Sequence, residues 1–331
     1  MPNSFMFLVS CLYGLILLIS SERLYIRQSD NYFVPNNAYI KGLLISIAPL
    51  FAFYKFGING VLNEKKVKTS IIFLIFITIA QYYSNFVSLF IEFGGIFVNN
   101  YAYSFVLLMP FSFFLADKKW VKYLFLLFCF GFVLFGAKKG AIFTGMLCML
   151  YCLWNDMNTI SVFKKTLTLI LSVLAFLFFI YVFSLYMNDA WDLVVTRMEL
   201  LGDGNMSHRD LLYSTFWDHF LYKSDFVEQL LGHGAYATLK VYDNFAHNDW
   251  LEFLIDQGLL SVLIYAIYFV SFYRYVTKKL HNNKFSAALK MIFIILFART
   301  LFSMSFCENT IALNIMLGYL FAIKGKQLQK I

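Results

Sequence analysis

The sequence carries little charge for its length. Charged residues make up 14% of the 331 residues, whereas hydrophobic residues make up 60% and the mean hydropathy is +0.68. A soluble chain of this size carries nearer half apolar residues, because its interior has no room for more. Aromatic residues reach 20%, and a soluble protein exposing that much aromatic surface would aggregate. The composition therefore excludes an ordinary soluble enzyme and predicts an all-α integral membrane protein.

The sequence also lacks the motifs that hold nucleotides, metals or disulfides. It has no glycine-rich phosphate loop and no convincing metal-ligand spacing, which argues against cytoplasmic nucleotide-sugar chemistry. The cysteines lie in or beside apolar runs without paired spacing, so we expect them to be packing residues. They are Cys11, Cys129, Cys148, Cys152 and Cys307. We expect neither a metal ion nor a cofactor.

A basic domain and a cleavable signal peptide are missing too. The net charge is +8, but Lys and Arg are scattered in short clusters between apolar runs, so a nucleic-acid partner is not expected. The first apolar run has no basic segment before it and no small-residue cleavage site after it. We therefore expect this run to be retained as a membrane span.

Roughly ten apolar runs are long enough to be considered as membrane-spanning helices. They cover residues 5–19, 38–56, 70–91, 100–116, 121–135, 141–154, 166–187, 250–273, 287–304 and 309–323. When the sides alternate, one side receives most of the basic residues in short connections, and the positive-inside rule assigns that side to the cytoplasm. These residues include Lys65, Lys66, Lys68, Lys118, Lys119, Lys122, Lys164, Lys165, Arg274, Lys278, Lys279, Lys284, Lys324, Lys326 and Lys330. Both termini are then cytoplasmic.

This topology divides the chain into three parts. Residues 1–187 hold the first seven spans, residues 188–249 form a long exterior loop, and residues 250–331 hold the last three spans. Loops of that length are uncommon and usually functional. No internal repeat is visible, whereas many transporters are built from inverted repeats.

The loop is expected to contain a short surface helix. Ser207 and Asp210 have the spacing of a capping box, and Leu212, Phe216 and Phe220 follow at helical spacing. We expect this apolar stripe to lie along the membrane surface.

Two basic or titratable residues, His208 and Arg209, fall in the first turn of that helix. A cation there opposes the helix dipole, and such a placement invites a functional explanation. Arg209 and the free N–H groups could form an anion site. The alternative is an ordinary solvated arginine.

Polar residues crowd the outer end of the eighth span, where the chain reads HNDWLEFLIDQG. His247 could handle a hydroxyl proton, and Asn248 and Glu252 are four residues apart on one helical face. Asp256 continues that face into an apolar segment, where a carboxylate is costly, so we expect the face to line a cavity. The alternative is that these residues cap the helix or contact headgroups.

Further cations are predicted on the exterior side. Lys138 and Lys139 lie between two short spans, so the tip that carries them is expected to be drawn into the protein. Arg299 lies inside the ninth span near its outer end, where Glu308 could neutralise it. Headgroup contact is the alternative for the lysines. Together, several cations, a histidine and carboxylates suit a lipid-linked diphosphate held from the exterior side.

Three motifs resemble the O-antigen polymerase and O-antigen ligase superfamily. GAKKGAI resembles its Ser-Arg-Gly turn, SHRDLLY its loop arginine motif, and LGHGAY with HNDWLEFLIDQGLLS its Gly-x-Gly and His-Asn-x-x-Leu-Glu signature. The similarity covers most of residues 121–273. Lys139 stands where the family usually has arginine, and a lysine there would lose the bidentate contact with phosphate.

The resemblance implies a GT-C-like glycosyltransferase of the bacterial inner membrane that needs no metal. Lys139 and Arg209 would contact the undecaprenyl diphosphate of the donor, and His247 would act at the reacting centre. From their positions, Glu252 joins His247 as a candidate catalytic residue, and Lys138, Asn248 and Arg299 join the candidate binding residues.

The polymerase reaction is the preferred interpretation, with a chain-length regulator and a flippase of the same pathway as possible partners. The alternatives are transfer of polysaccharide to lipid A core by a ligase, and a lipid-linked oligosaccharide flippase or transporter.

Overall fold

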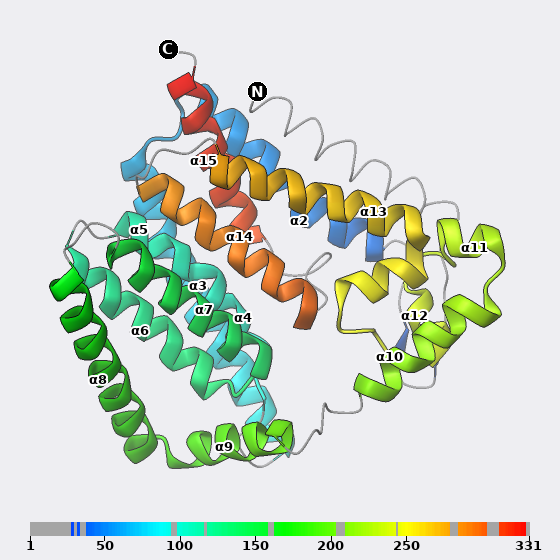
Figure 1. The fold of residues 1–331 in the computed structure, drawn as a ribbon, viewed down its shortest axis with the longest axis horizontal. Helices are drawn as coiled ribbons and strands as arrows, with labels where there is room; N and C mark the ends of the chain where they lie inside the picture. Colours follow the sequence, from blue (N-terminus) through cyan, green and yellow to red (C-terminus); the bar gives the residue numbers. More distant parts are fainter. Residues whose placement is uncertain are drawn as a thin grey trace. The chain divides into compact units, whose positions relative to one another are not determined.

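A computed structural model describes ten stretches of the chain and shows a helical protein (Figure 1). The stretches are residues 28–29, 32–33, 38–93, 98–115, 118–157, 162–202, 209–242, 244–278, 284–302 and 311–328. Apart from the helices, β1 (Gln28–Ser29) pairs antiparallel with β2 (Tyr32–Phe33). The predicted all-α class is confirmed, whereas the first predicted span, 5–19, lies outside the described residues.

The chain divides into two compact units, each assembled from distant segments. Unit 1 comprises Met1–Leu62, Met206–Leu280 and Leu296–Ile331, and unit 2 comprises Asn63–Asn205 and His281–Ile295. The predicted loop of residues 188–249 is therefore shared between the units. Helix α14 (Lys284–Phe302) contributes its first part to unit 2 and its last turns to unit 1.

Besides the first part of α14, unit 2 consists of consecutive helices packed through aromatic side chains. They are α3 (Glu64–Phe93), α4 (Ala102–Leu108), η1 (Met109–Phe111), α5 (Ser112–Leu115), α6 (Lys119–Phe135), α7 (Lys139–Met157), α8 (Val162–Tyr186) and α9 (Asn188–Gly202). Phe105 of α4 stacks on Phe132 of α6 with ring centroids 4.2 Å apart. The predicted span of residues 100–116 corresponds to the apolar helical stretch Ala102–Leu115, which tightens into the 3-10 turn η1 at Pro110, a residue that lacks an N–H.

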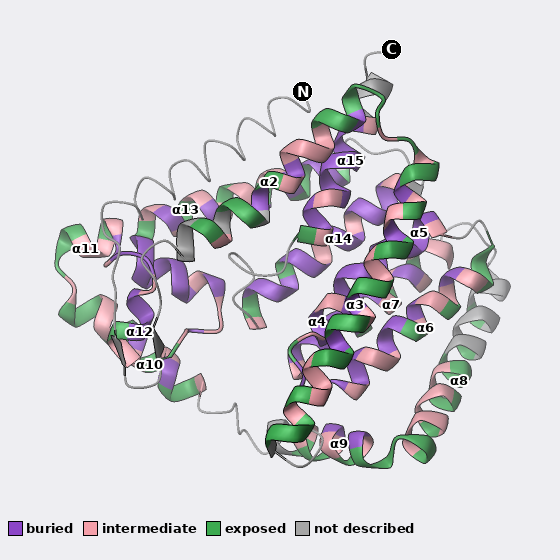
Figure 2. Ribbon diagram, turned by 180° about the vertical axis from the view of Figure 1, so that it is seen from behind, coloured by how far each residue is buried: buried purple, intermediate pink, exposed green. Residues whose placement is uncertain are grey.

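Large apolar side chains cover the outside of several helices. Phe76 of α3 is 66% exposed and Phe178 of α8 is 68% exposed, and Figure 2 shows exposed residues along both helices. Three helical segments of the described chain are long and apolar enough to cross a membrane: Glu64–Glu92, Asp249–Thr277 and Phe285–Phe302. A fourth is added if the pair Val173–Tyr186 and Asn188–Glu199, bent by 116°, counts as one span. These features are compatible with a helical membrane protein, while the count of ten spans stays a prediction.

A buried ion pair joins α6 to α7 near their charged ends. Lys122 Nζ lies 2.5 Å from Asp156 Oδ2, and the Tyr123 hydroxyl donates to the same oxygen at 3.0 Å. Trp120 and Trp154, close by in sequence, are 60% and 66% exposed. Exposed tryptophans beside charged helix ends are typical of a membrane–water interface.

Unit 1 holds the remaining helices. They are α2 (Ala38–Ile58), α10 (Arg209–Asp218), the π-helical turn η2 (His219–Lys223), α11 (Phe226–Leu231), α12 (Ala237–Tyr242), α13 (Asp249–Lys278) and α15 (Ile311–Leu328), with the last turns of α14. α2 and α15 pack closely at glycines. A Cβ on Gly318 would lie 2.3 Å from the Leu50 carbonyl oxygen, and one on Gly57 would lie 2.4 Å from Ala322 Cβ. Such small residues let helices approach within a membrane.

Helix α13 is interrupted at Gly258, whose φ of 73° no ordinary helical residue adopts. The break removes the helical partners of two carbonyl groups, and the turn after α11 replaces them. The N–H of His233 donates to the Ile255 carbonyl at 2.9 Å, and that of Gly234 donates to the Asp256 carbonyl at 2.8 Å. The turn after α11 and the broken helix α13 are therefore held together by backbone hydrogen bonds.

The apolar stripe of α10 is buried in protein. Leu212 and Phe216 are 3% and 0% exposed and pack in a cluster with Leu251 and Ile255 of α13, with Phe220 at its edge. The prediction that this stripe lies along the membrane surface is wrong, because the first turns of α13 cover it.

Candidate functional site

The first turn of α13 is held by Asn248. Its Oδ1 accepts hydrogen bonds from the N–H groups of Trp250 at 3.0 Å and Leu251 at 3.3 Å, as an N-cap residue does. The amide that was predicted to bind substrate therefore has a capping role.

His247, just before this cap, has a left-handed backbone. Its φ is 52°, a conformation uncommon for residues with a side chain, and its side chain is half-buried. Strained backbones of this kind cluster at functional sites, although strain by itself defines no chemistry. The imidazole is held at the start of α13 by a backbone that favours glycine.

Two candidate arginines and the first turn of α13, which follows His247, are brought to one place, the last turn of α14. The Trp250 indole N–H donates to Thr300 Oγ1 at 3.0 Å, which joins the first turn of α13 to this turn. Arg209 Nη2 lies 3.4 Å from the carbonyl oxygen of Phe302, the last residue of α14. Arg299, one residue before Thr300, is 2% exposed. Arg209, Arg299 and the His247 segment thus converge here.

The contact of Arg209 explains why a cation is tolerated at the N-terminus of α10. A helix C-terminus carries partial negative charge and unsatisfied carbonyl groups. The guanidinium lies against the C-terminal carbonyl of α14, which offsets the repulsion from its own helix. One such contact uses one of the five N–H donors of an arginine.

Aromatic side chains of α13 pack around its first turn. Tyr265 donates from its hydroxyl to Asp249 Oδ2 at 2.9 Å, and its ring lies 5.1 Å from that of Trp250. Asp249 is 1% exposed. Sequence reasoning missed Trp250, Tyr265 and Thr300 as parts of the site, since only their contacts across α13 and α14 reveal them.

The carboxylates of Glu252 and Asp256 lie on one face of α13, as predicted, but that face is covered by the loop. Glu252 accepts from Thr238 Oγ1 at 2.6 Å and from the Ala246 N–H at 2.7 Å. Asp256 accepts from the N–H groups of Tyr236 at 2.9 Å and Thr238 at 3.2 Å. The two side chains are 8% and 1% exposed, so the expected cavity along this face is replaced by packed loop.

Lys138 and Lys139 belong to unit 2. Lys138 Nζ donates to Asn100 Oδ1 at 2.7 Å, and Lys139 is the first residue of α7. Both lysines are half-buried, while Gly136 and Ala137 before them are buried. The turn is thus partly drawn into its unit, and Ala137 has a φ of 47° there.

A second polar cluster, which sequence reasoning missed, links η2 to the turn after α11. His233 Nε2 lies 2.8 Å from Ser224 Oγ, and its Nδ1 lies 3.4 Å from Glu228 Oε1. The His219 ring lies 4.9 Å from the His233 ring. Burial lowers the pKa of His219 below its ordinary value, and repulsion from a protonated His233 and from Lys223 lowers it further.

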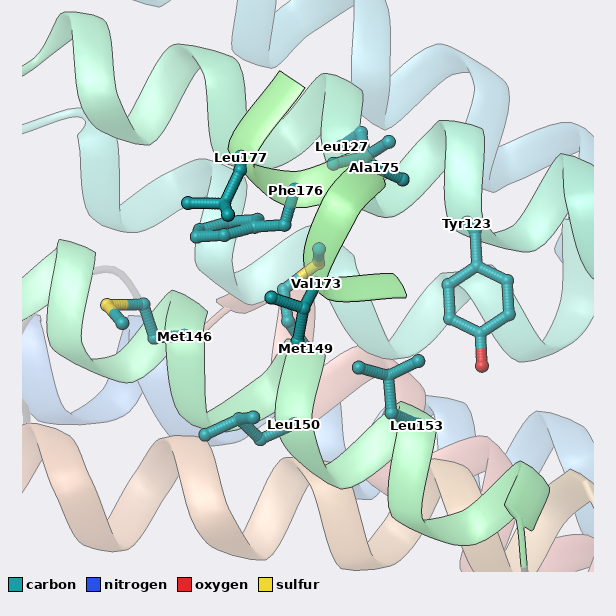
Figure 3. A pocket seen from close by; sticks show the side chains of 10 residues that line it. All are labelled: Tyr123, Leu127, Met146, Met149, Leu150, Leu153, Val173, Ala175, Phe176 and Leu177. Atoms are coloured by element: carbon teal, nitrogen blue, oxygen red, sulfur yellow. The ribbon is translucent and has the colours of Figure 1, made fainter. Parts of the chain in front are cut away.

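A pocket of about 240 Å³ lies between α6, α7 and α8 of unit 2 (Figure 3). Its lining is apolar except for the Tyr123 hydroxyl, and Met146 and Met149 are among the side chains that form it. Such a lining suits hydrocarbon and offers no cation for a diphosphate.

Some predicted residues cannot be placed. Ser207, His208 and Glu308 lie outside the described residues, so the predicted capping box and the predicted Arg299–Glu308 neutralisation stay predictions. Of the predicted packing cysteines, Cys129, Cys148 and Cys152 are buried and unbridged, as expected. Among the described residues, no group of three His, Cys, Asp or Glu side chains could hold a metal ion.

Comparison with family models, curated proteins and solved structures gives no match for this chain.

Proposed function

We propose that this protein is a membrane glycosyltransferase that joins polyprenyl-diphosphate-linked oligosaccharide repeat units into a polymer on the exterior face of the membrane. The observation that carries the proposal is the convergence of Arg209, Arg299 and the His247 segment on the last turn of α14. The resemblance of the Arg209 and His247 segments to O-antigen polymerases supports the choice of reaction. The proposal includes insertion of α13 and α14 in the membrane, which their length and composition support.

In this proposal the cations of the site bind the donor. Arg209 and Arg299 come from different helices, and guanidinium groups bind phosphate oxygens bidentately. Two arginines would offset the charge that develops on a leaving diphosphate, a role that metal ions fill in other transferases. The half-buried Arg209 is accessible enough to contact the donor, whereas the buried Arg299 would act through its charge.

The proposed reaction is a single displacement. A hydroxyl oxygen of the acceptor attacks the anomeric carbon of the donor, the bond from that carbon to the diphosphate oxygen breaks, and polyprenyl diphosphate leaves. The hydroxyl proton passes to a ring nitrogen of His247. Displacement from the opposite side inverts the anomeric configuration.

Glu252 has a positioning role in this scheme. Each of its carboxylate oxygens accepts a hydrogen bond from the loop, and one of these comes from Ala246, the neighbour of His247. Glu252 thereby fixes the segment that carries the imidazole. Lys139 is retained as a proposed donor contact on the basis of the family resemblance alone, and Lys138 on the basis of its position beside it.

The test is polymer formation by the purified full-length protein in liposomes with synthetic undecaprenyl-diphosphate repeat units. Arg209→Ala should abolish the product ladder at near-normal protein levels, and Arg209→Lys should restore little if the contact is bidentate. Lys240→Ala, which removes an exposed cation of the same unit, is the matched control and should keep wild-type activity. Full activity of Arg209→Ala would contradict the site.

The alternatives give different products. A ligase would transfer polymer to lipid A core and would not lengthen repeat units alone. A flippase would form no glycosidic bond in liposomes. In cells, a deletion strain that keeps a single repeat unit on its lipopolysaccharide indicates a polymerase, whereas complete loss of O-antigen from the core indicates a ligase or flippase.

A further inference from the structure

Large apolar side chains gather on the outside of the segment formed by residues 217–231, here called the tip hairpin. It comprises the end of α10, η2 and α11, and exposed residues are prominent there in Figure 2. The exposed fractions are 47% for Trp217, 51% for Leu221, 81% for Tyr222, 78% for Phe226, 47% for Val227 and 40% for Leu230. Large apolar side chains exposed together on one segment indicate contact with a partner or a membrane.

The tip hairpin presents these side chains from an ordered frame. Asp225 and Glu228 form a reciprocal capping box at the start of α11, with hydrogen bonds of 2.8 and 2.9 Å. The Gln229 side-chain amide donates to the Phe220 carbonyl at 2.9 Å, which ties α11 back to η2. The exposure of the apolar side chains is therefore a property of the fold.

The depth of α11 follows from its contact with α13. A Cβ on Gly258 would lie 2.4 Å from the Leu230 carbonyl group, so the end of α11 touches α13 at the break. Sixteen residues separate Gly258 from the exposed Arg274, a rise of roughly 24 Å. If Arg274 marks the cytoplasmic edge of a hydrocarbon core of about 30 Å, then Gly258 lies within the outer leaflet.

The backbone at this contact meets the requirement of a hydrocarbon environment. Non-helical backbone at membrane depth is tolerated only where protein satisfies its polar groups. The Gly232 N–H donates to the Glu228 carbonyl at 2.7 Å, and the next two N–H groups donate to the carbonyls that the break in α13 releases. The region combines satisfied backbone with exposed apolar side chains.

We propose that the tip hairpin is a membrane anchor that inserts Tyr222, Phe226, Val227 and Leu230 into the exterior leaflet beside α13. Aromatic side chains are favoured at the headgroup level, and the exposed Lys223 can extend toward lipid phosphate. The anchor would hold the loop that carries His233 and His247 at the depth of a lipid-linked substrate. This inference rests on the proposed membrane span of α13.

The test uses single cysteines in the full-length protein after replacement of its native cysteines. Each is labelled with a nitroxide, reconstituted in phosphatidylethanolamine and phosphatidylglycerol vesicles, and probed by collision with oxygen and with a water-soluble nickel chelate. Positions 222, 226 and 230 are compared with two references. Ile267, 53% exposed in the middle of α13, reports lipid, and Asn244, exposed before α13 begins, reports water.

We expect positions 222, 226 and 230 to resemble Ile267, with oxygen collisions exceeding nickel collisions severalfold. Nickel accessibility like that of Asn244 would show a solvent-exposed hairpin and overturn the anchor. Protection from both reagents would show a protein-covered surface and overturn it as well. If position 267 itself is accessible to the nickel chelate, the proposed membrane span of α13 is wrong, and the proposed anchor is wrong with it. Because the side chains are exposed, these substitutions should not disturb folding.

Discussion

At the scale of single residues, the left-handed backbone of His247 lets the effect of a substitution on stability be measured separately from its effect on the transfer rate. Its φ of 52° costs a residue with a side chain on the order of 1 kcal/mol relative to glycine. We therefore expect His247→Gly to unfold at a higher temperature than His247→Ala, while transfer falls by about a hundredfold in both, the usual scale for loss of a general base. Thermal unfolding and polymer synthesis measure the two effects.

His247→Ala and His247→Gln complete that comparison. The Ala variant keeps a Cβ, so it retains the backbone strain that the Gly variant loses, and donor binding should be largely retained in both. The Gln variant should regain part of the rate if the imidazole mainly orients the hydroxyl, and almost none if it accepts the proton. An Ala variant with wild-type turnover would remove His247 from the mechanism.

Glu252 can be tested by an isosteric change. In Glu252→Gln, the amide oxygen can still accept from the Ala246 N–H while the amide N–H donates to Thr238 Oγ1, so the loop should keep its conformation. A positioning role then predicts activity within a few-fold of the wild type, whereas Glu252→Ala, which leaves buried donors unsatisfied, should lose both stability and activity. An inactive but stable Gln variant would instead indicate that the carboxylate acts in catalysis.

His219 predicts a pH dependence of the tip hairpin. Its pKa is lowered in the folded protein by burial and by His233 and Lys223, and Glu228 opposes this only in part. The unfolded segment therefore binds more protons just below the ordinary histidine pKa, and stability falls as the pH drops through that range. The thermal unfolding temperature of the reconstituted protein should therefore be lower at acidic pH. His219→Gln should weaken this dependence, and equal slopes for both proteins would exclude His219 as its source.

At the scale of elements, the break in α13 gives the sharpest prediction about stability. Gly258→Ala would place a Cβ 2.4 Å from the Leu230 backbone at a φ of 73°, so we expect destabilisation on the order of 4 kcal/mol and release of α11. Gly131→Ala is the matched control, because its Cβ would meet only Phe179 at 3.6 Å inside helix α6. It should be neutral or stabilising by up to about 1 kcal/mol. Thermal unfolding and protease sensitivity near residue 231 measure the difference.

The helices could be predicted where the signal is local. Apolar runs placed residues 38–56 and 121–135 within α2 and α6, because the length of a run alone defines a buried or lipid-facing helix. The break at Gly258 could not be predicted, since it depends on the turn around Gly232, far away in the sequence. Periodicity found the stripe of Leu212 and Phe216 but could not distinguish lipid from α13 as the surface that buries it.

The sequence predicted which residues belong to the candidate site better than it predicted the contacts that those residues make. Arg209, His247 and Arg299 are predicted because cations and imidazoles near a membrane surface require a reason. The two arginines lie at the last turn of α14, and His247 precedes the first turn of α13, which contacts that turn through Trp250. The hydrogen bond between Trp250 and Thr300 joins the helices near these residues. It depends on tertiary packing, which no spacing in the sequence encodes. Glu252 shows the reverse case, because its spacing looked catalytic while its contacts are those of a loop support.

At the scale of the whole molecule, the prediction concerns sidedness. Lys65 and Lys118 are exposed and are predicted to be cytoplasmic, whereas His247 and the nearby exposed Asn244 are predicted to be exterior. In a cysteine-free background, an impermeant maleimide should label position 244 in intact spheroplasts and should reach position 65 or 118 only after lysis. Labelling of position 118 from outside would contradict the topology.

The meeting of Gly232 and Gly258 has a consequence for how this sequence can vary in evolution. A Cβ on Gly232 would lie 2.3 Å from the Asp256 carbonyl oxygen, and one on Gly258 would meet the Leu230 backbone. Because both obstacles are backbone atoms, no substitution of a neighbouring side chain can make room for either Cβ. A change at one position cannot be compensated by a smaller residue at the other. Descendants that keep the break must keep both glycines, and a lineage that straightens the helix is released from both constraints together. Among homologues, the two positions should therefore be retained or lost as a pair, which offers a marker for distant relatives in which the surrounding apolar residues have diverged.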